Sequence, residues 1–485
     1  MITHQPVNNH DDLLKVVDSM LDEIGLSRGD LDGKVTFAGR DPIMNTTLKV
    51  GAAGGIIGAV NSFASAVIWQ MRSGEGQDIH ADLRKTYAIQ SAFNPGMEKY
   101  SMINGYSVLY DADTASFSGV LPTKDSRFVF LATLYPRQRL TALNLLRCSF
   151  SLDALKQASR KWDAEDLEAA AMDAMVPIHN IRTQKEFQAT EHWEHHAATP
   201  LIHIEKIGDS DPEPFTPAER PLSGIRATGF WHVIAGPVIA RQLAAQGADC
   251  MNLCKQQWHA DKMMYFTSEA GTRQAMLDAS LPENKNQVYE LVKDADVFIE
   301  NLRPGLADSE GFSAEELAVH RPGLIHVHDQ LNVATGPWSG WPGFDMNAGA
   351  LTGIFTDADG TPSAPRNPAT WVVNDYLTGY LGAIGAQAAL IRRAKEGGSY
   401  RVKVTLAQCA TWLLGLGVVD KDMLLDMKSL GKEHQAMEPN TVTGPTPYGE
   451  LTRLGSQMEM SKTPEYWEDP ILNVPGSCMP EWLPR

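Results

Sequence analysis

The chain from residue 224 onward alternates between short apolar segments and helical segments, and this alternation constrains the fold more than any other feature. The apolar segments predict strands, and the segments between them have the length and end signals of helices. The expected strands are residues 224–231, 248–254, 296–301 and 323–331, and the expected helices are residues 236–247, 283–295 and 313–320. Such alternation predicts an α/β fold with a doubly wound, Rossmann-like parallel sheet.

The first part of the chain has a different pattern. We expect helices at residues 15–24, 49–70 and 152–175 and strands at 78–82 and 127–135. Residues 209–221, "DSDPEPFTPAERP", contain four prolines and alternating charges, which is typical of a linker. The sequence therefore predicts two parts, residues 1–215 and 216–485, the first including a smaller α+β domain.

Residues 51–70, "GAAGGIIGAVNSFASAVIWQ", are uncharged and long enough to cross a membrane. Gly, Ala and Ser dominate the segment, however, which favours a helix packed closely inside a protein. The glycine spacing G-x-x-G-G-x-x-G also differs from the dinucleotide fingerprint G-x-G-x-x-G. Close packing is therefore the favoured interpretation, and a dinucleotide-binding oxidoreductase stays as an alternative.

The charge of the chain limits its partners. Its formal net charge of −17 makes nucleic acid an unfavourable partner, but a local basic pocket can still bind a small anion. The five cysteines are scattered without a CxxC pair, which favours free thiols in a reducing compartment. The N-terminal residues have no basic segment followed by an apolar run. We therefore expect a cytoplasmic protein that is not associated with a membrane.

The segment "EHWEHH" places His192 and His196 four residues apart, with His195 between them. On a helix, this spacing allows two histidines to share a metal ion. The order differs from H-E-x-x-H, and no further acidic ligand is indicated, so the end of a solvated helix is the favoured interpretation. No metal centre is expected.

An internal repeat joins the two parts of the chain. Residues 66–83 align without gaps with residues 389–406, at a constant offset of 323 residues. Identities include Ala66 with Ala389 and Gly74 with Gly397. Both segments predict a small-residue helix, a basic turn with glycine, a short strand and a second helix. The pattern indicates a pair of similar units.

Two segments carry candidate chemistry. Asn301 and Arg303 follow an expected strand, at the edge where open parallel sheets bind ligands, and arginine is suited to phosphate. Asp345 is a lone acid in the stretch "WPGFDMNAGALTG". It could cap a helix or act as a nucleophile, because an ordinary aspartate is ionised at neutral pH without a base.

From residue 220 the sequence resembles the class III CoA-transferases, the family that includes formyl-CoA transferase and the CaiB/BaiF proteins. The similar segments include "HVIAGPVIARQLAAQGADC", "VFIENLRPG", "GPWSGWPGFD" and "NDYLTGYLGAIGAQAALIRRAKEGG", in this order. The first part resembles the later half of the same family, including its small domain. The resemblance thus implies a fused or rearranged pair, with a truncated first copy and a second copy that carries the catalytic half.

The resemblance implies roles for particular residues. Asp345 corresponds to the carboxylate that attacks the acyl-CoA thioester and forms a covalent aspartyl intermediate. The residues implied to bind coenzyme A are Val233, Ala235, Lys255, Leu277, Asn301, Leu302 and Arg303. No cofactor beyond CoA is implied, the other substrate is a small carboxylic acid, and the family's chains pair as homodimers.

Departures from the family pattern define the alternatives. Ile234 replaces a glutamine of formyl-CoA transferase, so formyl-CoA is not the expected donor. Phe344 stands where the racemase branch has histidine, which disfavours a two-base racemase. A racemase or lyase-like relative that uses Asp345 as a base, and a non-catalytic CoA-binding subunit, both stay open.

Overall fold

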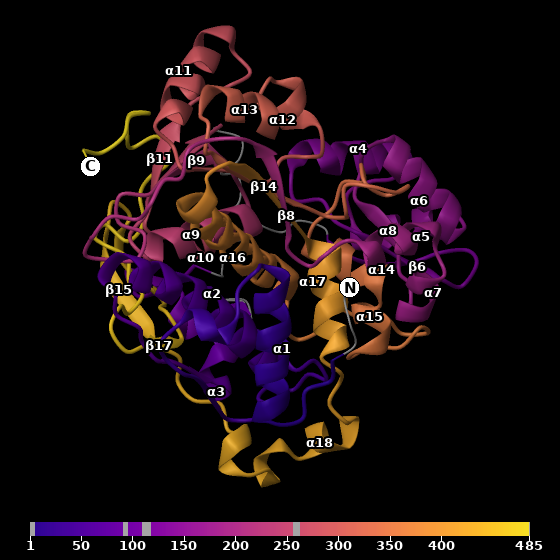
Figure 1. Cartoon of the computed structure of the whole chain (residues 1–485). Coiled ribbons are helices and arrows are strands. Elements are labelled where there is room, and N and C mark those ends of the chain that lie inside the picture. The colour runs from indigo at the N-terminus through magenta and orange to yellow at the C-terminus, as the bar shows by residue number, and fades with distance from the viewer. Residues whose placement is uncertain (1–4, 91–95, 109–117, 256–261, 485) are drawn as a thin grey trace.

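A seven-stranded sheet forms the centre of the computed structural model, which describes residues 5–90, 96–108, 118–255 and 262–484 (Figure 1). The strand order is β11-β10-β9-β12-β13-β14-β8; all neighbours are parallel except β14 and β8. The strands are β8 (His203–Gly208), β9 (Arg226–Phe230), β10 (Asp249–Cys254), β11 (Thr272–Met276), β12 (Val297–Glu300), β13 (Ile325–Gln330) and β14 (Ser399–Thr405). The predicted parallel sheet is confirmed, whereas β8 and β11 were not expected.

Helices cover both faces of this sheet, as a doubly wound fold requires. On one face lie α9 (Ala235–Ala245) and α16 (Val373–Glu396), and on the other α11 (Pro282–Lys293) and α13 (Ala314–His320) (Figure 1). Alternate residues of a strand serve the two cores, so that Ile299 packs on the α9 side and Phe298 on the α11 side. The order of the strands places the topological switch point between β9 and β12.

Helix α2 (Val50–Ser73) is buried against α16. Within the described part of the chain, α2 is the one helix that is long and apolar enough to cross a membrane. Its apolar stretch is wholly buried in the fold. A side chain on Gly58 would put its Cβ 2.5 Å from the Met458 sulfur, so glycine permits the close approach. The Ser65 hydroxyl donates to Gln387 Oε1 at 2.5 Å across the helix pair. The prediction of an internally packed helix is confirmed.

The internal repeat has a structural counterpart. Helices α2 and α16 both have 24 residues, and their ends are related by the offset of the aligned segments. Each is followed by a strand and a helix: β2 (Ile79–Asp82) with α3 (Leu83–Thr86), and β14 with α17 (Leu406–Gly415). The two predicted units thus have the same local structure, and their long helices pack on each other.

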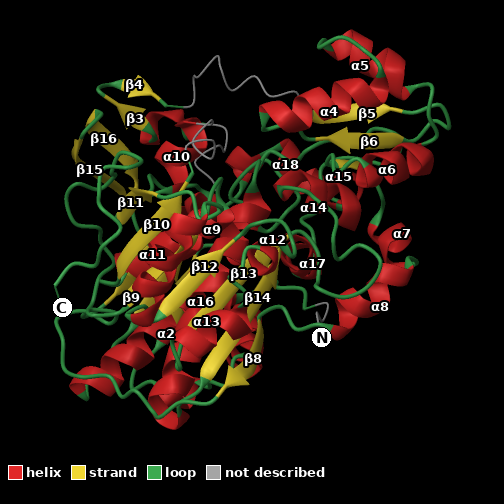
Figure 2. Cartoon of the chain, turned by 90° about the horizontal axis from the view of Figure 1, so that it is seen from above, coloured by secondary structure: helices red, strands yellow, loops and turns green. Residues whose placement is uncertain are grey.

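A small α+β subdomain, which includes α4, lies beside the main sheet in both views (Figure 2). Its strands are β5 (Gly119–Pro122), β6 (Phe128–Leu131) and β7 (Ile178–Asn180), and its helices are α4 (Pro136–Leu146), α5 (Leu152–Ser159) and α6 (Ala164–Asp173). The single helix expected at 152–175 is therefore wrong. The chain turns after Ser159, and Asp163 is extended at the start of α6.

Two further sheets join segments from the beginning and end of the chain: β1-β2-β17 and β15-β16-β3-β4. Their other strands are β1 (Val35–Ala38), β3 (Met102–Ile103), β4 (Tyr106–Ser107), β15 (Thr441–Thr446), β16 (Gly449–Leu454) and β17 (Met458–Met460). The remaining α-helices are α1 (His10–Glu23), α7 (Gln184–Gln188), α8 (Glu191–Ala198), α10 (Lys262–Ser268), α12 (Leu306–Ser309), α14 (Asp345–Thr352), α15 (Ile354–Asp357) and α18 (Lys421–Leu425).

The two predicted parts, residues 1–215 and 216–485, pack as one body. Strand β8 of the first part is an edge of the main sheet, and β17 of the second part pairs with β2. The proline-rich segment expected to be a linker is also packed. Its Phe215 lies against the core, and its Glu213 forms an ion pair with Arg321 at 2.7 Å. The division into two sequence copies stays a prediction, but it is not a division in space.

Candidate active site

A cavity of about 1090 Å³ opens at the carboxyl ends of β9 and β12. His232 and Val233 follow β9, and Asn301 follows β12, so the cavity lies at the topological switch point. The small subdomain forms the opposite wall through Tyr135 and Arg137. A cleft between two subdomains, with few polar groups among apolar walls, is typical of a small-molecule site.

The structure brings together most of the residues predicted from the sequence. The predicted CoA contacts that line the cavity are Val233, Ala235, Lys255, Asn301, Leu302 and Arg303. Leu277 does not line it. This side chain is 6% exposed and packs with Met251 and Phe298 in the core beneath α11. Its side chain thus packs in that core, and its contact with a ligand stays a prediction.

The loop after β9 is held in a strained conformation. Val233 has φ of 68°, which a β-branched residue rarely adopts. The Ser268 hydroxyl donates to the Val233 carbonyl at 2.8 Å. Asn301 accepts from the His232 amide at 3.1 Å and donates to the His232 carbonyl at 2.8 Å. Asn301 thus ties together the loops after β9 and β12, and strain of this kind is common where a loop is shaped to hold a ligand.

Three cationic side chains face the cavity. Lys255 is paired with Asp278 at 2.8 Å, so its charge is partly neutralised. Arg303 on one wall and Arg137 on the other form no ion pair within the described residues, and both are exposed. Planar guanidinium groups bind phosphate or carboxylate in pairs of hydrogen bonds. The cavity can therefore hold a ligand that carries several negative charges.

Asp345 is the first residue of α14 and is 2% exposed. Its Oδ2 accepts a hydrogen bond from the Asp375 amide, in the first turn of α16, at 2.9 Å. The carboxylate thus lies at the positive ends of two helices, a favourable place for a negative charge. Its neighbours Gly343 and Phe344 and its hydrogen-bond partner Asp375 line the cavity, whereas Asp345 itself does not.

Two more acids share this region, and the sequence did not single them out. Asp375 and Asp329 both line the cavity and are at least 94% buried. Burial raises the pKa of Asp345, against the opposing hydrogen bonds from the amides of Asp375 and Asn374. Burial and the nearby Asp345 charge raise the pKa of Asp375 further. Burial raises the pKa of Asp329 to about 8. Of the three, Asp345 is the carboxylate that accepts a backbone amide hydrogen bond from the described residues, which opposes the rise in its pKa.

Segments of the small subdomain hold α14 in place. The His179 ring bonds to the Pro342 carbonyl at 2.8 Å, and the Arg182 amide donates to the Ala350 carbonyl at 2.9 Å. Beneath them, Glu168 is buried and accepts from the Arg182 guanidinium at 2.9 Å and from the Asn180 amide at 2.8 Å. The position of Asp345 therefore depends on an ion pair in the small subdomain.

Sequence reasoning also missed the contact between Tyr135 and His232. The Tyr135 hydroxyl lies 2.7 Å from His232 Nδ1 and links the small subdomain to the loop after β9. Residues that meet across two subdomains have no fixed spacing in the sequence, so no local pattern could have revealed this pair. An acid within an apolar segment, by contrast, could have indicated Asp329 in "GLIHVHDQL" and Asp375 in "NDYLTGY".

The histidines of "EHWEHH" lie on a helix, α8, but the prediction of a solvated end is wrong for two of them. His192 and His196 are fully buried, and burial lowers the pKa of each, to about 4 and about 3. The His192 ring stacks on Trp338 at 5.1 Å and the His196 ring on Trp193 at 5.4 Å. These rings are parts of an aromatic cluster, and no group of metal-binding side chains occurs in the described ranges.

Comparison with known proteins relates the part of the chain that holds this site to a family. Residues 222–444 match CoA-transferase family III. This part of the chain is similar in sequence to the class III CoA-transferases. The matched segment contains Asp345 and every predicted CoA contact.

Individual relatives cover parts of the chain. The acetyl-coenzyme A transferase nodX of Hypoxylon pulicicidum is 27% identical over 338 residues, which are 64% of this chain and 57% of that protein. The succinate–glutarate CoA-transferase of Agrobacterium fabrum is 31% identical over 205 residues, 38% of this chain and 51% of that protein. The chain thus spans little more than half the length of these curated relatives. A CaiB/BaiF family protein from Brucella suis has a solved structure that aligns with a TM-score of 0.38 at 24% identity, covering 48% of this chain and 65% of that one.

The strain at Val233 leads to a testable expectation. Replacing Val233 by glycine removes the cost of the positive φ, so we expect the free energy of unfolding to rise by about 1 kcal/mol. The same change loosens the loop, so calorimetry should show weaker binding of CoA. Val418→Gly is the matched control, because Val418 is 49% exposed and is not among the residues with positive φ. This control should destabilise the protein and leave CoA binding unchanged. A loss of stability in Val233→Gly would show that the loop is not strained.

Proposed function

We propose that the protein is a CoA-transferase that moves coenzyme A from an acyl-CoA thioester to a carboxylic acid. The observation that carries this proposal is the position of Asp345, at the ends of two helices and next to residues that line a cavity at the switch point. In its ionised form, a buried carboxylate that accepts amide hydrogen bonds can attack a carbonyl without a general base. The family match of the surrounding segment supports the same assignment.

In the proposed reaction, an Asp345 oxygen attacks the thioester carbonyl, the carbon–sulfur bond breaks, and CoA leaves as a thiolate. The thiolate attacks the aspartyl carbonyl of the mixed anhydride and releases the donor acid as a carboxylate. The acceptor carboxylate then attacks the aspartyl thioester, which gives a second anhydride and frees the thiolate. Attack of the thiolate on the acceptor carbonyl forms the new acyl-CoA and restores Asp345. Each step exchanges a carboxylate and a thiolate, so the proposal needs no cofactor beyond CoA.

The walls of the cavity have complementary parts in this proposal. Arg303 and Lys255 face the cavity from the main sheet and are suited to the phosphates of CoA. The loop after β9, with Val233 and Ala235, lies against the pantetheine arm. Arg137 on the opposite wall is available to the carboxylate of the second substrate. The relatives' names suggest short-chain mono- or dicarboxylic acids as substrates to test first.

The decisive experiment is a transfer screen. The protein is incubated with acetyl-CoA or succinyl-CoA and a set of carboxylic acids, and new CoA esters are detected by mass spectrometry. We expect at least one pair to give a new ester. Free CoA binding without transfer in any pair would favour a non-catalytic CoA-binding subunit. Exchange of the α-proton of the acyl group in heavy water, without transfer, would instead indicate a racemase or lyase-like enzyme.

For an active donor, Arg303→Ala should raise KM for the acyl-CoA by about tenfold and leave kcat nearly unchanged, because a phosphate contact far from the reacting atoms acts on binding. Steady-state kinetics at fixed ionic strength measure both constants. Arg160→Ala is the control, since Arg160 is exposed and does not line the cavity. A drop in kcat with KM unchanged would contradict the assignment of Arg303 to the phosphates.

The quaternary structure belongs to the same proposal. We propose a homodimer, on the basis of the sequence resemblance to a family whose chains pair. Light scattering coupled to size-exclusion chromatography measures the mass directly, and a monomer of 53.2 kDa would contradict it.

A further inference from the structure

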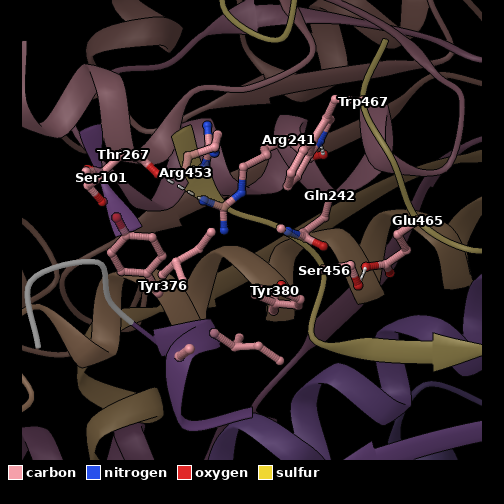
Figure 3. A pocket seen from close by; sticks show the side chains of 14 residues that line it. Ser101, Arg241, Gln242, Thr267, Tyr376, Tyr380, Arg453, Ser456, Glu465 and Trp467 are labelled. Atoms are coloured by element: carbon pink, nitrogen blue, oxygen red, sulfur yellow. Dashed lines mark hydrogen bonds between the residues drawn. The ribbon is translucent and has the colours of Figure 1, made fainter. Parts of the chain in front are cut away.

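A second, smaller cavity lies further along α9, and two buried arginines line it (Figure 3). Its volume is about 30 Å³. Arg241 comes from α9 and is 6% exposed, and Arg453 comes from β16 and is 3% exposed. Tyr376 and Tyr380 of α16 and Trp467 of the C-terminal segment complete much of the lining. Charged side chains are rarely this buried unless a partner offsets the charge.

The protein supplies only neutral partners to the two guanidinium groups. Arg241 donates to the Thr267 carbonyl at 3.2 Å, and Arg453 donates to the same carbonyl at 2.9 Å and to the Glu269 carbonyl. Within the described part of the chain, neither arginine has a carboxylate within 4.0 Å, the limit for an ion pair. The Nε atoms of both are buried and have no hydrogen-bond partner. Two like charges therefore meet at one carbonyl oxygen and keep unused donors.

The acids nearest to the arginines point elsewhere. The Glu465 carboxylate also lines the cavity, but it accepts from the Ser456 hydroxyl at 2.6 Å and from Gln246 at 3.1 Å. The Glu269 carboxylate accepts from the side chains of Thr272 and Gln274. Burial raises the pKa of both acids, that of Glu269 to about 7, and the nearby arginine charges oppose this rise. Neither carboxylate, however, lies close enough to form an ion pair with Arg241 or Arg453 within the described residues.

Aromatic rings leave the arginines access to the cavity. The Arg241 guanidinium lies 5.5 Å from the Tyr376 ring, and the Arg453 guanidinium lies 5.1 Å from the Trp467 ring (Figure 3). The Tyr376 hydroxyl is buried without a hydrogen-bond partner and is a further donor. Rings of this kind offset part of a positive charge and leave the N–H edges free. Burial and the nearby Arg241 charge lower the pKa of Arg453 to about 9, which reflects the cost of holding the two charges together.

We propose that Arg241 and Arg453 bind a halide-sized anion in this cavity, with chloride as the occupant in solution. A buried water requires roughly 10–15 Å³, so the cavity has room for a single-atom anion and little more. Water could satisfy the free Nε donors but could not offset two charges. The anion would connect α9 of the main sheet with β16 and the C-terminal segment, in addition to the hydrogen bond from the Trp467 indole to the Arg241 carbonyl at 3.0 Å.

Crystals grown from sodium bromide test the position of the anion directly. We expect an anomalous peak for bromide within contact distance of both guanidinium groups. Density that refines as water alone, with no anomalous signal, would overturn the proposal. This measurement uses the unmodified protein and therefore does not depend on any variant folding.

Thermal unfolding tests the energetic role of the anion. At constant ionic strength, replacing sodium gluconate by sodium chloride should raise the Tm by about 2 °C and then saturate, as expected for a ligand of the folded state. Arg241→Gln and Arg453→Met should abolish the shift. Arg273→Met is the matched control, because Arg273 is partly buried but is paired with Asp249 at 2.8 Å. The control should lower the Tm and keep the full chloride response. Equal chloride responses in wild type and Arg453→Met would contradict the site.

Discussion

Replacing Asp345 by asparagine is expected to lower the rate of CoA transfer by at least about 10³-fold, because the amide cannot form the covalent intermediate. The fold should survive, since an asparagine oxygen can still accept the hydrogen bond from the Asp375 amide. Transfer is measured as the new CoA ester, and circular dichroism and thermal unfolding check the structure. Asp308→Asn is the matched control. Asp308 is an exposed acid near the cavity whose side chain does not line it, so the rate should not change.

Trapping identifies which acid reacts. After incubation with acyl-CoA and hydroxylamine or borohydride, a peptide that contains Asp345 should carry the modification, and Asp345→Asn should carry none. A modification on Asp375 or Asp329 would contradict the assignment, although both line the same cavity. Burial raises the pKa of both, that of Asp329 to about 8, and within the described residues neither carboxylate accepts the kind of amide hydrogen bond that Asp345 accepts from Asp375.

The pH dependence of transfer gives a second check on the same residue. Burial raises the pKa of Asp345, and the ionised form is the nucleophile. The rate should therefore still be rising at a pH above about 5, where an exposed aspartate would already be fully ionised. A rate that is flat from about pH 5 upward would place the reactive carboxylate in water rather than in the buried site.

The sequence predicted the parts of the fold that depend on local pattern. Strand and helix alternation predicted the parallel sheet, and the offset between residues 66–83 and 389–406 correctly identified two segments of equal local structure. It did not reveal that β8 pairs antiparallel with β14, because a strand's partner is decided by contacts between distant residues. For the same reason, the proline-rich segment looked like a linker, while the ion pair between Glu213 and Arg321 holds it on the core.

Prediction of the site had a similar limit. Asn301 and Arg303, which follow β12, were identified because open parallel sheets bind ligands at the carboxyl ends of their strands, whereas Val233 and Ala235, after β9, were implied by the family resemblance. Leu277 follows β11 at the same edge, but its side chain turns into the core beneath α11. Asp375 was missed because its role depends on the approach of the α16 N-terminus to α14, which no spacing in the sequence encodes. The small-subdomain wall with Tyr135 and Arg137 was missed for the same reason.

The second large effect is expected at Glu168, which does not line the cavity and lies beneath the segment that holds α14. Replacing Glu168 by glutamine removes the partner of Arg182, whose charge is nine-tenths buried. Breaking a buried pair from one side typically costs about 3–5 kcal/mol, so we expect a loss of this size in the free energy of unfolding. Chemical denaturation measures it. Glu186→Gln is the matched control: Glu186 pairs with Arg127, but both side chains are more than a third exposed, and the loss should stay below about 1 kcal/mol.

The same ion pair predicts how the protein responds to acid. Burial alone would raise the pKa of Glu168, but the hydrogen bonds and charge of Arg182, with a smaller contribution from His179, lower it to about 2. A depressed carboxylate stabilises the folded state above its ordinary pKa of 4.5, and that contribution is lost as the pH falls from about 4.5 toward 2. Its size is about 3 kcal/mol at neutral pH. Glu168→Gln should therefore be less sensitive to acid than the wild type in this range.

Because the Arg182 amide holds α14 through Ala350, CoA transfer should also decline in this variant before the protein unfolds. Wild-type transfer in a fully folded Glu168→Gln variant would show that α14 keeps Asp345 in place without this anchor.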